Sequence, residues 1–283
     1  MSNLGFLEDK FDTQLASRQD DRFLLSLIPY EKTTTYKKGT RNGPEAIVDA
    51  SGHIELFDEK LRIDASKWGI RTLRPTITDL TSITKHAADL SMPDTGLAGF
   101  IGGEHSITPA IIEGLGLSDI GIVWVDAHSD LRKSYCGRED NHACAGYNSL
   151  RFGRIVQIGI RSLAEEEVEV LERDDRVLIF PEWDAAARTA LRELPDDVYF
   201  SFDLDGFSPE LMRAVGTPEP GGLSWSAAQE ILDFVYANKT VKAFDVVELC
   251  PNEEDVVSSF TAARLVYKML QYHAHYKLRE FGR

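Results

Sequence analysis

Cysteine is scarce in this chain of 283 residues, which contains only Cys136, Cys144 and Cys250. Three scattered cysteines exclude the disulfide framework that holds many small secreted proteins together. No segment approaches the roughly 18 consecutive apolar residues of a membrane helix. The first residues lack both the basic start and the apolar run of a secretory signal. We therefore expect a cytoplasmic protein with no membrane partner.

Basic residues are also under-represented, because 31 Lys and Arg stand against 46 Asp and Glu, giving a formal net charge of −15. Phosphate contacts need clustered Lys and Arg, so we expect no nucleic-acid partner. A negative field is compatible with a small cationic substrate, although an acidic surface also simply keeps a protein soluble. The hydrophobic fraction of 43% allows a well-packed core.

Short apolar runs alternate along the chain with amphipathic segments. Strands are predicted for residues 22–28, 99–101, 120–125, 155–160, 177–180, 198–202 and 241–247, and helices for 163–173, 224–237 and 258–272. Pro44 suits the first turn of a further short helix that runs through Ala50. This alternation predicts an α/β fold with a mainly parallel sheet covered on both faces. No shift in composition marks a boundary, so residues 1–283 are interpreted as one domain.

Polar clusters follow four of these predicted strands. They are His105 after Gly102-Gly103-Glu104, then Asp126, His128 and Asp130, then Asp203 and Asp205, and finally Glu248. In open parallel sheets, ligand sites lie beyond the carboxyl ends of the strands, so these side chains should converge. Carboxylates packed this closely repel one another and need a compensating cation.

Six candidate ligands, four of them carboxylates, exceed what a closed tetrahedral zinc site takes. They suit two divalent ions about 3.5–4 Å apart. An oxygen-rich set with two imidazoles favours Mn²⁺. An isolated Asp-x-His or Asp-x-Asp is more often a turn or a cap, but three ordered clusters at strand ends indicate a metal site.

These motifs resemble the ureohydrolase family, which includes arginases and agmatinases. The resemblance runs from about Tyr36 to Lys268 and includes residues 38–44, 102–106, 126–130, 201–209 and 216–224. It implies a three-layer α/β/α fold, two Mn²⁺ per chain and a homotrimeric or homohexameric assembly. Many members have Asp where this chain has Glu104, which is not a ligand position.

The resemblance also implies roles for individual residues. His105, Asp126, Asp130 and Asp203 match the ligands of one ion, and Asp126, His128, Asp203 and Asp205 match those of the other. Asp126 and Asp203 would bridge the two ions. His142 matches a catalytic histidine, Glu248 matches the carboxylate that receives the guanidinium, and Asp130 is placed among the catalytic residues as well.

The chemistry of a guanidinium explains why such a site is needed. Its carbon is cationic, resonance-stabilised and a poor electrophile, whereas a metal ion lowers the pKa of water from about 15.7 to about 7. Glu248 would hold the guanidinium by charge-assisted hydrogen bonds, and His142 would pass a proton to the leaving amine. Alternatively, His142 is a solvated loop residue and Glu248 a structural ion-pair partner.

The expected reaction is hydrolysis of agmatine to putrescine and urea, a step of polyamine biosynthesis. Leu131-Arg132 resembles the agmatinase branch, and Glu139 and Asp140 would suit a tail ammonium. The main alternative is 4-guanidinobutanoate, whose carboxylate Arg132, Lys133 or Arg138 could bind. Aminopropylagmatine and arginine also stay open.

Two other classes of protein fit less well. A single-zinc amide deacetylase would lack the second ligand set, and a binding module without catalysis would have lost a ligand, His142 or Glu248.

Three smaller features complete the predictions. His273 and His275 lie two apart on a predicted helix, do not face together, and are interpreted as surface residues. Glu165 to Glu167 begin a helix, where negative charge suits the helix dipole. Cys136 and Cys144 flank His142 on the expected active-site loop.

Overall fold

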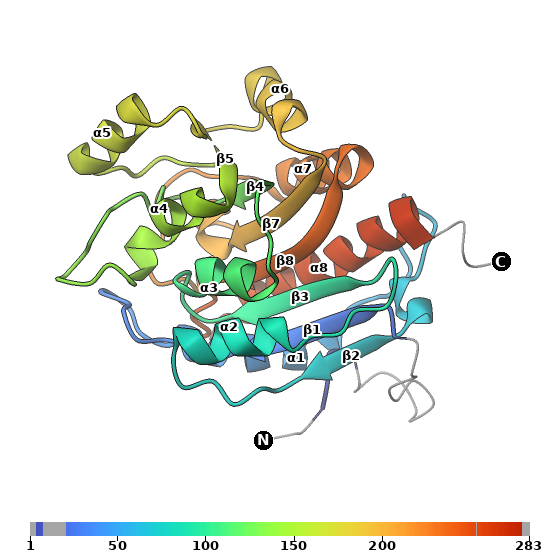
Figure 1. Ribbon diagram of the computed structural model, residues 1–283. Coiled ribbons are helices and arrows are strands. Elements are labelled where there is room, and N and C mark those ends of the chain that lie inside the picture. Colours follow the sequence, from blue (N-terminus) through green and yellow to red (C-terminus); the bar gives the residue numbers. More distant parts are fainter. Residues whose placement is uncertain (1–3, 8–20, 253, 279–283) are drawn as a thin grey trace.

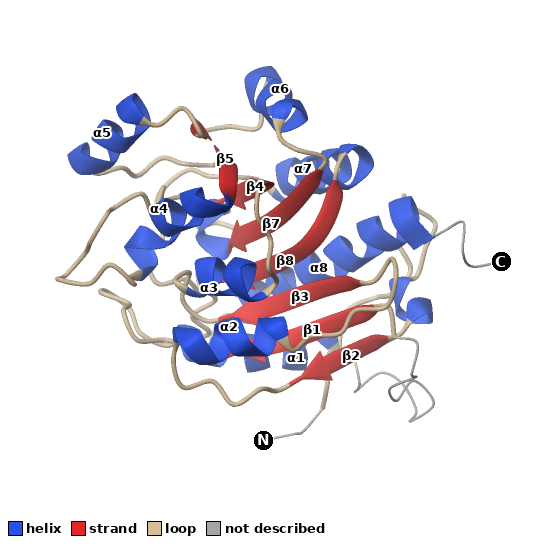
Figure 2. Ribbon diagram, in the orientation of Figure 1, coloured by secondary structure: helices blue, strands red, loops and turns tan. Residues whose placement is uncertain are grey.

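One eight-stranded sheet organises the computed structural model, which describes residues 4–7, 21–252 and 254–278. The expectation that residues 1–14 hold no secretory signal falls mostly outside these described residues. The strand order is β2-β1-β3-β8-β7-β4-β5-β6, and the paired strands run parallel (Figures 1 and 2). The strands are β1 (Phe23–Ile28), β2 (Ile70–Leu73), β3 (Leu97–Gly102), β4 (Ile120–Val125), β5 (Gly153–Ile158), β6 (Val177–Phe180), β7 (Asp197–Asp203) and β8 (Thr240–Val247).

This sheet confirms the predicted α/β class, and each of the seven predicted strands is present within a few residues of its expected bounds. Strand β2 was not predicted from the sequence. Its four residues are only half-buried and pair with β1 alone at the sheet edge. A short edge strand buries neither face fully, so it leaves no strong hydrophobic pattern in the sequence.

Helices cover both faces of the sheet (Figure 2). The helices are α1 (Gly43–Ser51), α2 (Leu80–Ala88), α3 (Ile107–Gly114), α4 (Ala145–Ser149), α5 (Glu165–Arg173), α6 (Ala185–Glu193), α7 (Trp225–Asn238) and α8 (Val256–His273). Residues of α1, α6, α7 and α8 share one apolar core, whereas residues of α2, α3, α4 and α5 share the other. Alternate side chains of β7 enter opposite cores, as Phe200 and Tyr199 do. The two cores define three layers, α/β/α.

Local sequence determines where several helices begin. Pro44 lies in the first turn of α1, and α5 begins at Glu165, both as predicted. The side chains of Asp184 and Ser224 accept hydrogen bonds from backbone N–H groups in the first turns of α6 and α7. Such caps satisfy N–H groups that have no partner within the helix.

The prediction that His273 is a surface residue is wrong. Its side chain is buried at the end of α8, Nε2 lies 2.9 Å from the Thr95 carbonyl oxygen, and the ring meets Phe23 edge-on. Burial lowers the pKa of His273 to about 4, so the imidazole is neutral there. Among the described residues, none of the helices combines the length and apolar character needed to cross a membrane.

Candidate active site

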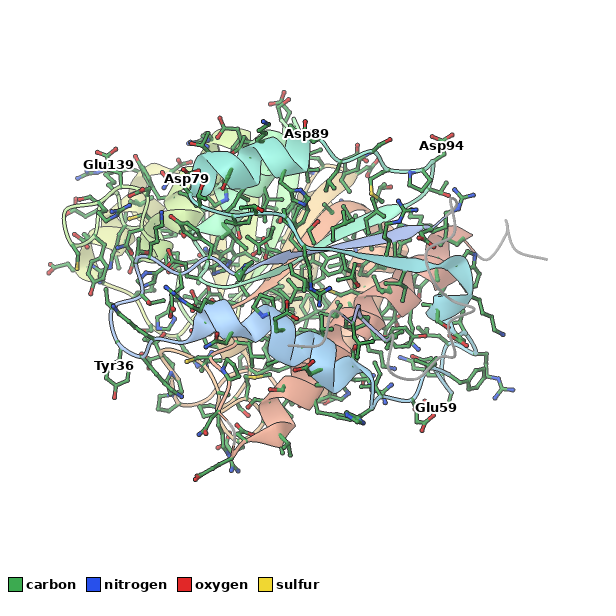
Figure 3. All side chains as sticks on the ribbon, turned by 90° about the horizontal axis from the view of Figure 1, so that it is seen from below. Tyr36, Glu59, Asp79, Asp89, Asp94 and Glu139 are labelled. Carbon is green, nitrogen blue, oxygen red and sulfur yellow. The ribbon has the colours of Figure 1, made fainter. Side chains whose placement is uncertain are left out.

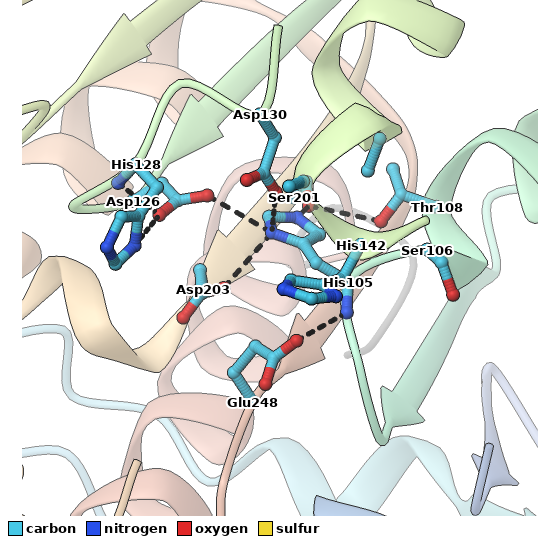
Figure 4. A network of polar contacts seen from close by, with 12 residues as sticks. His105, Ser106, Thr108, Asp126, His128, Asp130, His142, Ser201, Asp203 and Glu248 are labelled. Carbon is cyan, nitrogen blue, oxygen red and sulfur yellow. Dashed lines mark hydrogen bonds and ion pairs between the residues drawn. The ribbon is translucent and has the colours of Figure 1, made fainter. Parts of the chain in front are cut away.

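The four strands that carry the predicted polar clusters are consecutive in the sheet. Their order is β3-β8-β7-β4, although β8 is the last strand of the chain. Parallel strands end at the same edge, so the side chains that follow these four strands meet in one place. The structure therefore brings together all the predicted ligands, and Glu248 joins them from the end of β8 (Figure 4).

A first group of ligands surrounds the buried ring of His105. Nδ1 of His105 lies 3.1 Å from Oδ2 of Asp126, 3.1 Å from Oδ2 of Asp203 and 3.4 Å from Oδ2 of Asp130 (Figure 4). His105, Asp126 and Asp130 each offer an atom to a common point, which is the arrangement that a cation site needs.

A second group shares Asp126 with the first. Nδ1 of His128 lies 3.0 Å from Oδ2 of Asp205 and 3.7 Å from Oδ1 of Asp126. Asp126 therefore faces one histidine with each of its oxygens, and it belongs to both candidate ligand groups. This is the position that a bridging ligand would occupy. Oδ1 of Asp203 accepts a hydrogen bond from the N–H of Asp205, so a bridging role for Asp203 stays a prediction.

Hydrogen bonds from the chain hold these carboxylates in place. Asp126 accepts from the indole N–H of Trp124 at 2.9 Å and from the N–H of His128 at 2.6 Å. Asp130 and Glu248 have left-handed backbone conformations, with φ of 52° and 68°. Such conformations cost side-chain-bearing residues about 1–3 kcal/mol and gather at functional sites.

The electrostatics of the cluster are suited to a bound cation. Burial raises the pKa of Asp130, Asp203 and Asp205, and neighbouring carboxylates raise it further. Asp126 is an exception, because the neighbouring imidazoles of His105 and His128 lower its pKa more than burial raises it. A divalent ion would favour the ionised form of all four aspartates.

The tautomer of His105 tests whether these residues fit a metal ion. The Ser201 hydroxyl donates to Oδ1 of Asp245 at 2.7 Å, so it must accept from Nε2–H of His105 at 2.8 Å. In the neutral imidazole, which is the form that binds a metal ion, Nδ1 then carries a bare lone pair, and it makes no hydrogen bond within the described part of the chain. A lone pair among carboxylate oxygens is repulsive unless a cation lies between them. The donor set fits a metal ion.

His142 and Glu248 lie in the wall of the same pocket as the aspartates, a cavity of about 190 Å³. Burial lowers the pKa of His142, so the neutral ring is favoured near neutral pH. Burial also raises the pKa of Glu248 to about 8, although the N–H of His105 donates to Oε1 at 2.7 Å. A cationic substrate beside Glu248 would lower that pKa again. The structure thus places His142 and Glu248 beside the candidate metal ligands, which include Asp130, the third predicted catalytic residue.

The predicted recognition of the substrate tail by residues 132–140 is largely wrong. Glu139 and Asp140 line a different hollow, and Arg138 is bonded to Asp140. Arg132 does line the active-site pocket, but its guanidinium pairs with Glu166. Arg132, Arg138 and Asp140, which were expected to bind a substrate tail, are thus engaged in local ion pairs.

The pocket is also lined by residues to which the sequence patterns gave no role: Thr34, Thr35, Tyr36, Lys37, Gly216 and Thr217. All of these except the buried Gly216 reach the surface and form the pocket mouth. Tyr36 is 79% exposed, and Figure 3 shows it projecting from the same end of the molecule as Glu139 but well apart from it. The start of the family resemblance near Tyr36 was the signal that could have identified this loop.

Comparison with known proteins agrees with the fold and the site. The profile described as the Arginase family matches residues 21–271. The N(1)-aminopropylagmatine ureohydrolase of Synechocystis sp. is 34% identical over 94% of this chain and 93% of its own. The agmatinase of Pyrococcus horikoshii is 31% identical over 92% of this chain and 95% of its own. The chain belongs to the arginase family and is a ureohydrolase, a hydrolase that acts on guanidino C–N bonds.

A solved structure gives the same result. The agmatine ureohydrolase of Thermoplasma volcanium superposes with a TM-score of 0.81 and 27% sequence identity, covering 99% of this chain and 97% of that one. The family consists of binuclear metal enzymes, and the described residues include the candidate ligand groups around Asp126.

Proposed function

We propose that this ureohydrolase releases urea from a guanidino compound with an amine tail, N(1)-aminopropylagmatine in preference to agmatine. The observation that carries the proposal is the shared pocket of Glu248, His142 and the metal-ligand cluster. The names of the relatives from Synechocystis and Pyrococcus support an amine tail. This proposal replaces agmatine as the expected first substrate but keeps the reaction.

The shape of the pocket favours a longer tail. Its mouth is lined by Thr34, Thr35 and Tyr36, and the exposed Tyr36 leaves it open to solvent. Apart from Glu248 and the candidate metal ligands, the described residues that line the pocket include no carboxylate to bind a short tail ammonium. A longer amine tail reaches past the mouth to water and to the acidic surface of a chain with net charge −15.

The residues of the chain divide the chemistry between them. Glu248 accepts hydrogen bonds from the guanidinium and orients its carbon toward the aspartate cluster. His142 accepts a proton and returns it to the nitrogen that leaves as the amine product. We propose that His105, Asp126, His128, Asp130, Asp203 and Asp205 hold two Mn²⁺. When bound, these ions supply Lewis-acid activation of water at neutral pH.

A second candidate substrate rests on Lys37. This lysine lines the pocket mouth and makes no ion pair with a described residue. Its ammonium could pair with the tail carboxylate of 4-guanidinobutanoate. Lys37 thus favours a negatively charged substrate tail, whereas we propose a positively charged one.

Urea release from four compounds tests the proposal. N(1)-aminopropylagmatine and agmatine carry amine tails, whereas 4-guanidinobutanoate and arginine carry a carboxylate. An unpaired carboxylate in the pocket costs about 1–3 kcal/mol, which is about 5- to 150-fold in kcat/KM. Lys37→Gln should leave kcat/KM for the amine-tailed compounds unchanged or raised. A preference for 4-guanidinobutanoate that this variant abolishes would establish the second candidate instead.

The assembly and setting stay proposals as well. We expect a homotrimer or homohexamer in the cytoplasm with no nucleic-acid or membrane partner. Val256 and Phe260, at the start of α8, are exposed apolar side chains that could contribute to a subunit contact. Light scattering of the purified protein distinguishes a trimer or hexamer from a monomer.

A further inference from the structure

Glu104 is completely buried behind the active site, and neither the candidate ligand groups nor the pocket lining include it. Its carboxylate accepts four hydrogen bonds. Oε2 accepts from the N–H groups of Lys32 and Thr33, both at 2.6 Å. Oε1 accepts from the hydroxyls of Thr33 at 2.7 Å and Ser106 at 2.6 Å. Glu104 therefore holds the loop that carries Thr33 against the end of β3.

The Thr33 hydroxyl connects this carboxylate to the catalytic histidine. Its oxygen lies 2.9 Å from the backbone N of His142 and 3.1 Å from Nδ1 of the same residue. Glu104 and His142 lie 71 and 109 positions from Thr33 in the sequence, so only the fold brings the three residues together.

The protons around the Thr33 oxygen can be assigned by counting. A threonine hydroxyl has one hydrogen to donate and two lone pairs that accept. Its hydrogen goes to the Glu104 carboxylate, which accepts from all its neighbours. The backbone N–H of His142 can only donate and takes one lone pair. The remaining lone pair is left for Nδ1, so the neutral ring of His142 must carry its proton on Nδ1.

We infer that Thr33 and Glu104 are positioning residues that fix the tautomer and orientation of His142, an inference that rests on the proposed proton transfer by that histidine. With Nδ1 protonated and bonded to Thr33, Nε2 has a free lone pair. A proton is taken up at Nε2, and the same atom returns it to the leaving amine, so the ring is unchanged after each turnover. Loss of the Thr33 hydroxyl releases Nδ1, and the ring then populates the tautomer whose Nε2 cannot accept a proton.

Three variants test this arrangement by kinetics. Thr33→Val keeps the shape of the side chain and both backbone hydrogen bonds to Glu104. It should lower kcat about 10- to 100-fold, the usual scale for a partner that orients a histidine, with KM nearly unchanged. Thr33→Ser keeps the hydroxyl and should restore most of kcat. Ser106→Ala is the matched control, because it removes a hydroxyl from the same Glu104 oxygen without touching His142, and it should change kcat much less.

Ring nitrogen NMR reads the tautomer without any need for activity. The protein is loaded with a diamagnetic ion such as Mg²⁺ and measured at about pH 8, where a neutral imidazole is expected. The His142 signals are identified by their loss in His142→Asn. We expect a protonated Nδ1 and an unprotonated Nε2 in the wild type, and a mixture of tautomers in Thr33→Val.

The two measurements also separate the inference from the proposed function. A wild-type ring protonated on Nε2, or an unchanged kcat in Thr33→Val, would overturn the inference. Urea release from none of the four guanidino compounds would sink the proposed function, while the NMR result would still decide how Thr33 holds His142.

Discussion

The buried carboxylate of Asp58 and the buried carboxylates of the active-site cluster differ in the hydrogen-bond donors and charges that surround them. Asp58 accepts hydrogen bonds from the N–H groups of Lys60 and Leu61 and pairs with the ammonium of Lys268. Burial alone would raise the pKa of Asp58, but these donors outweigh it and the pKa is lowered. At Asp203 and Asp205, burial and neighbouring carboxylates both raise the pKa.

This comparison indicates a structural role for Asp58 and a ligand-binding role for the active-site aspartates. Beside Asp58, which serves the fold, the chain places the ammonium of Lys268. At the ends of β4 and β7 the described residues place two histidines among four carboxylates, and we propose that an ion from solution binds there. Changes at the two places should therefore separate stability from activity, and the metal-free protein should reveal the unbalanced charge directly.

The largest expected effect is on turnover at the active site. His142→Asn should slow kcat about 10²- to 10⁴-fold, the usual scale for a positioned acid or base, while it keeps the fold and both metal ions. Steady-state kinetics with metal analysis of the same preparation measures both quantities. Loss of the metals, or turnover at the full rate, would mean that His142 does not transfer the proton.

The opposite behaviour is expected of the Asp58 pair. Lys268→Met leaves a buried carboxylate without its partner and should lower the free energy of unfolding by about 3–5 kcal/mol. Because Lys268 does not line the active-site pocket, kcat of the folded variant should be unchanged. Lys60→Met is the matched control, because the Lys60 side chain is 65% exposed and its Nζ makes only a long ion pair, 3.8 Å from Oδ2 of Asp233. This variant should change the free energy of unfolding by at most about 0.5 kcal/mol. Urea unfolding curves compare the two variants, and equal losses would remove the contrast.

Metal removal should change stability with an informative sign. At metal concentrations near 100 times Kd, each bound ion stabilises the folded chain by about 2.7 kcal/mol, which chelation removes. Asp203→Asn should lose much of this gain, whereas His105→Asn should weaken mainly one ion. In the metal-free protein Asp203→Asn should be at least as stable as the wild type, because it removes a repelling charge. Destabilisation of the metal-free variant as large as that of Lys268→Met would show that the cluster is structural.

The smallest predicted effect concerns pH, and its sign differs between the two regions. The folded pKa of Asp203 is raised, so ionisation destabilises the metal-free fold. The gain in stability of Asp203→Asn over the wild type should therefore be largest at high pH and shrink as the pH falls through the raised pKa.

The pKa of Asp58 is lowered in the folded chain. Its contribution to the free energy of unfolding is therefore complete above the unfolded pKa of about 4 and is lost as the pH falls through the lowered, folded pKa. Unfolding of wild type, Asp203→Asn and Asp58→Asn at several pH values, with chelator present, checks both trends.

The parts of the structure that follow from local pattern were predicted from the sequence. Buried parallel strands produce apolar runs, and their ends determine where Asp126 and Asp203 must lie, so the convergence of these side chains was predicted correctly, while their role as metal ligands stays a prediction. The features that depend on distant contacts were not. His273 is buried because β1 packs against the end of α8, and Asp140 is unavailable to substrate because Arg138 binds it. The contact of Thr33 with His142 spans 109 residues and leaves no mark in the sequence.

The number of metal ions in the active enzyme tests the central claim most directly. The claim is that the six ligands from His105 to Asp205 hold two ions that are both needed for urea release. Metal-free protein is titrated with Mn²⁺ while bound metal and urea release are followed together. The account predicts that activity reaches its maximum at two ions per chain. Full activity with one ion per chain would contradict it.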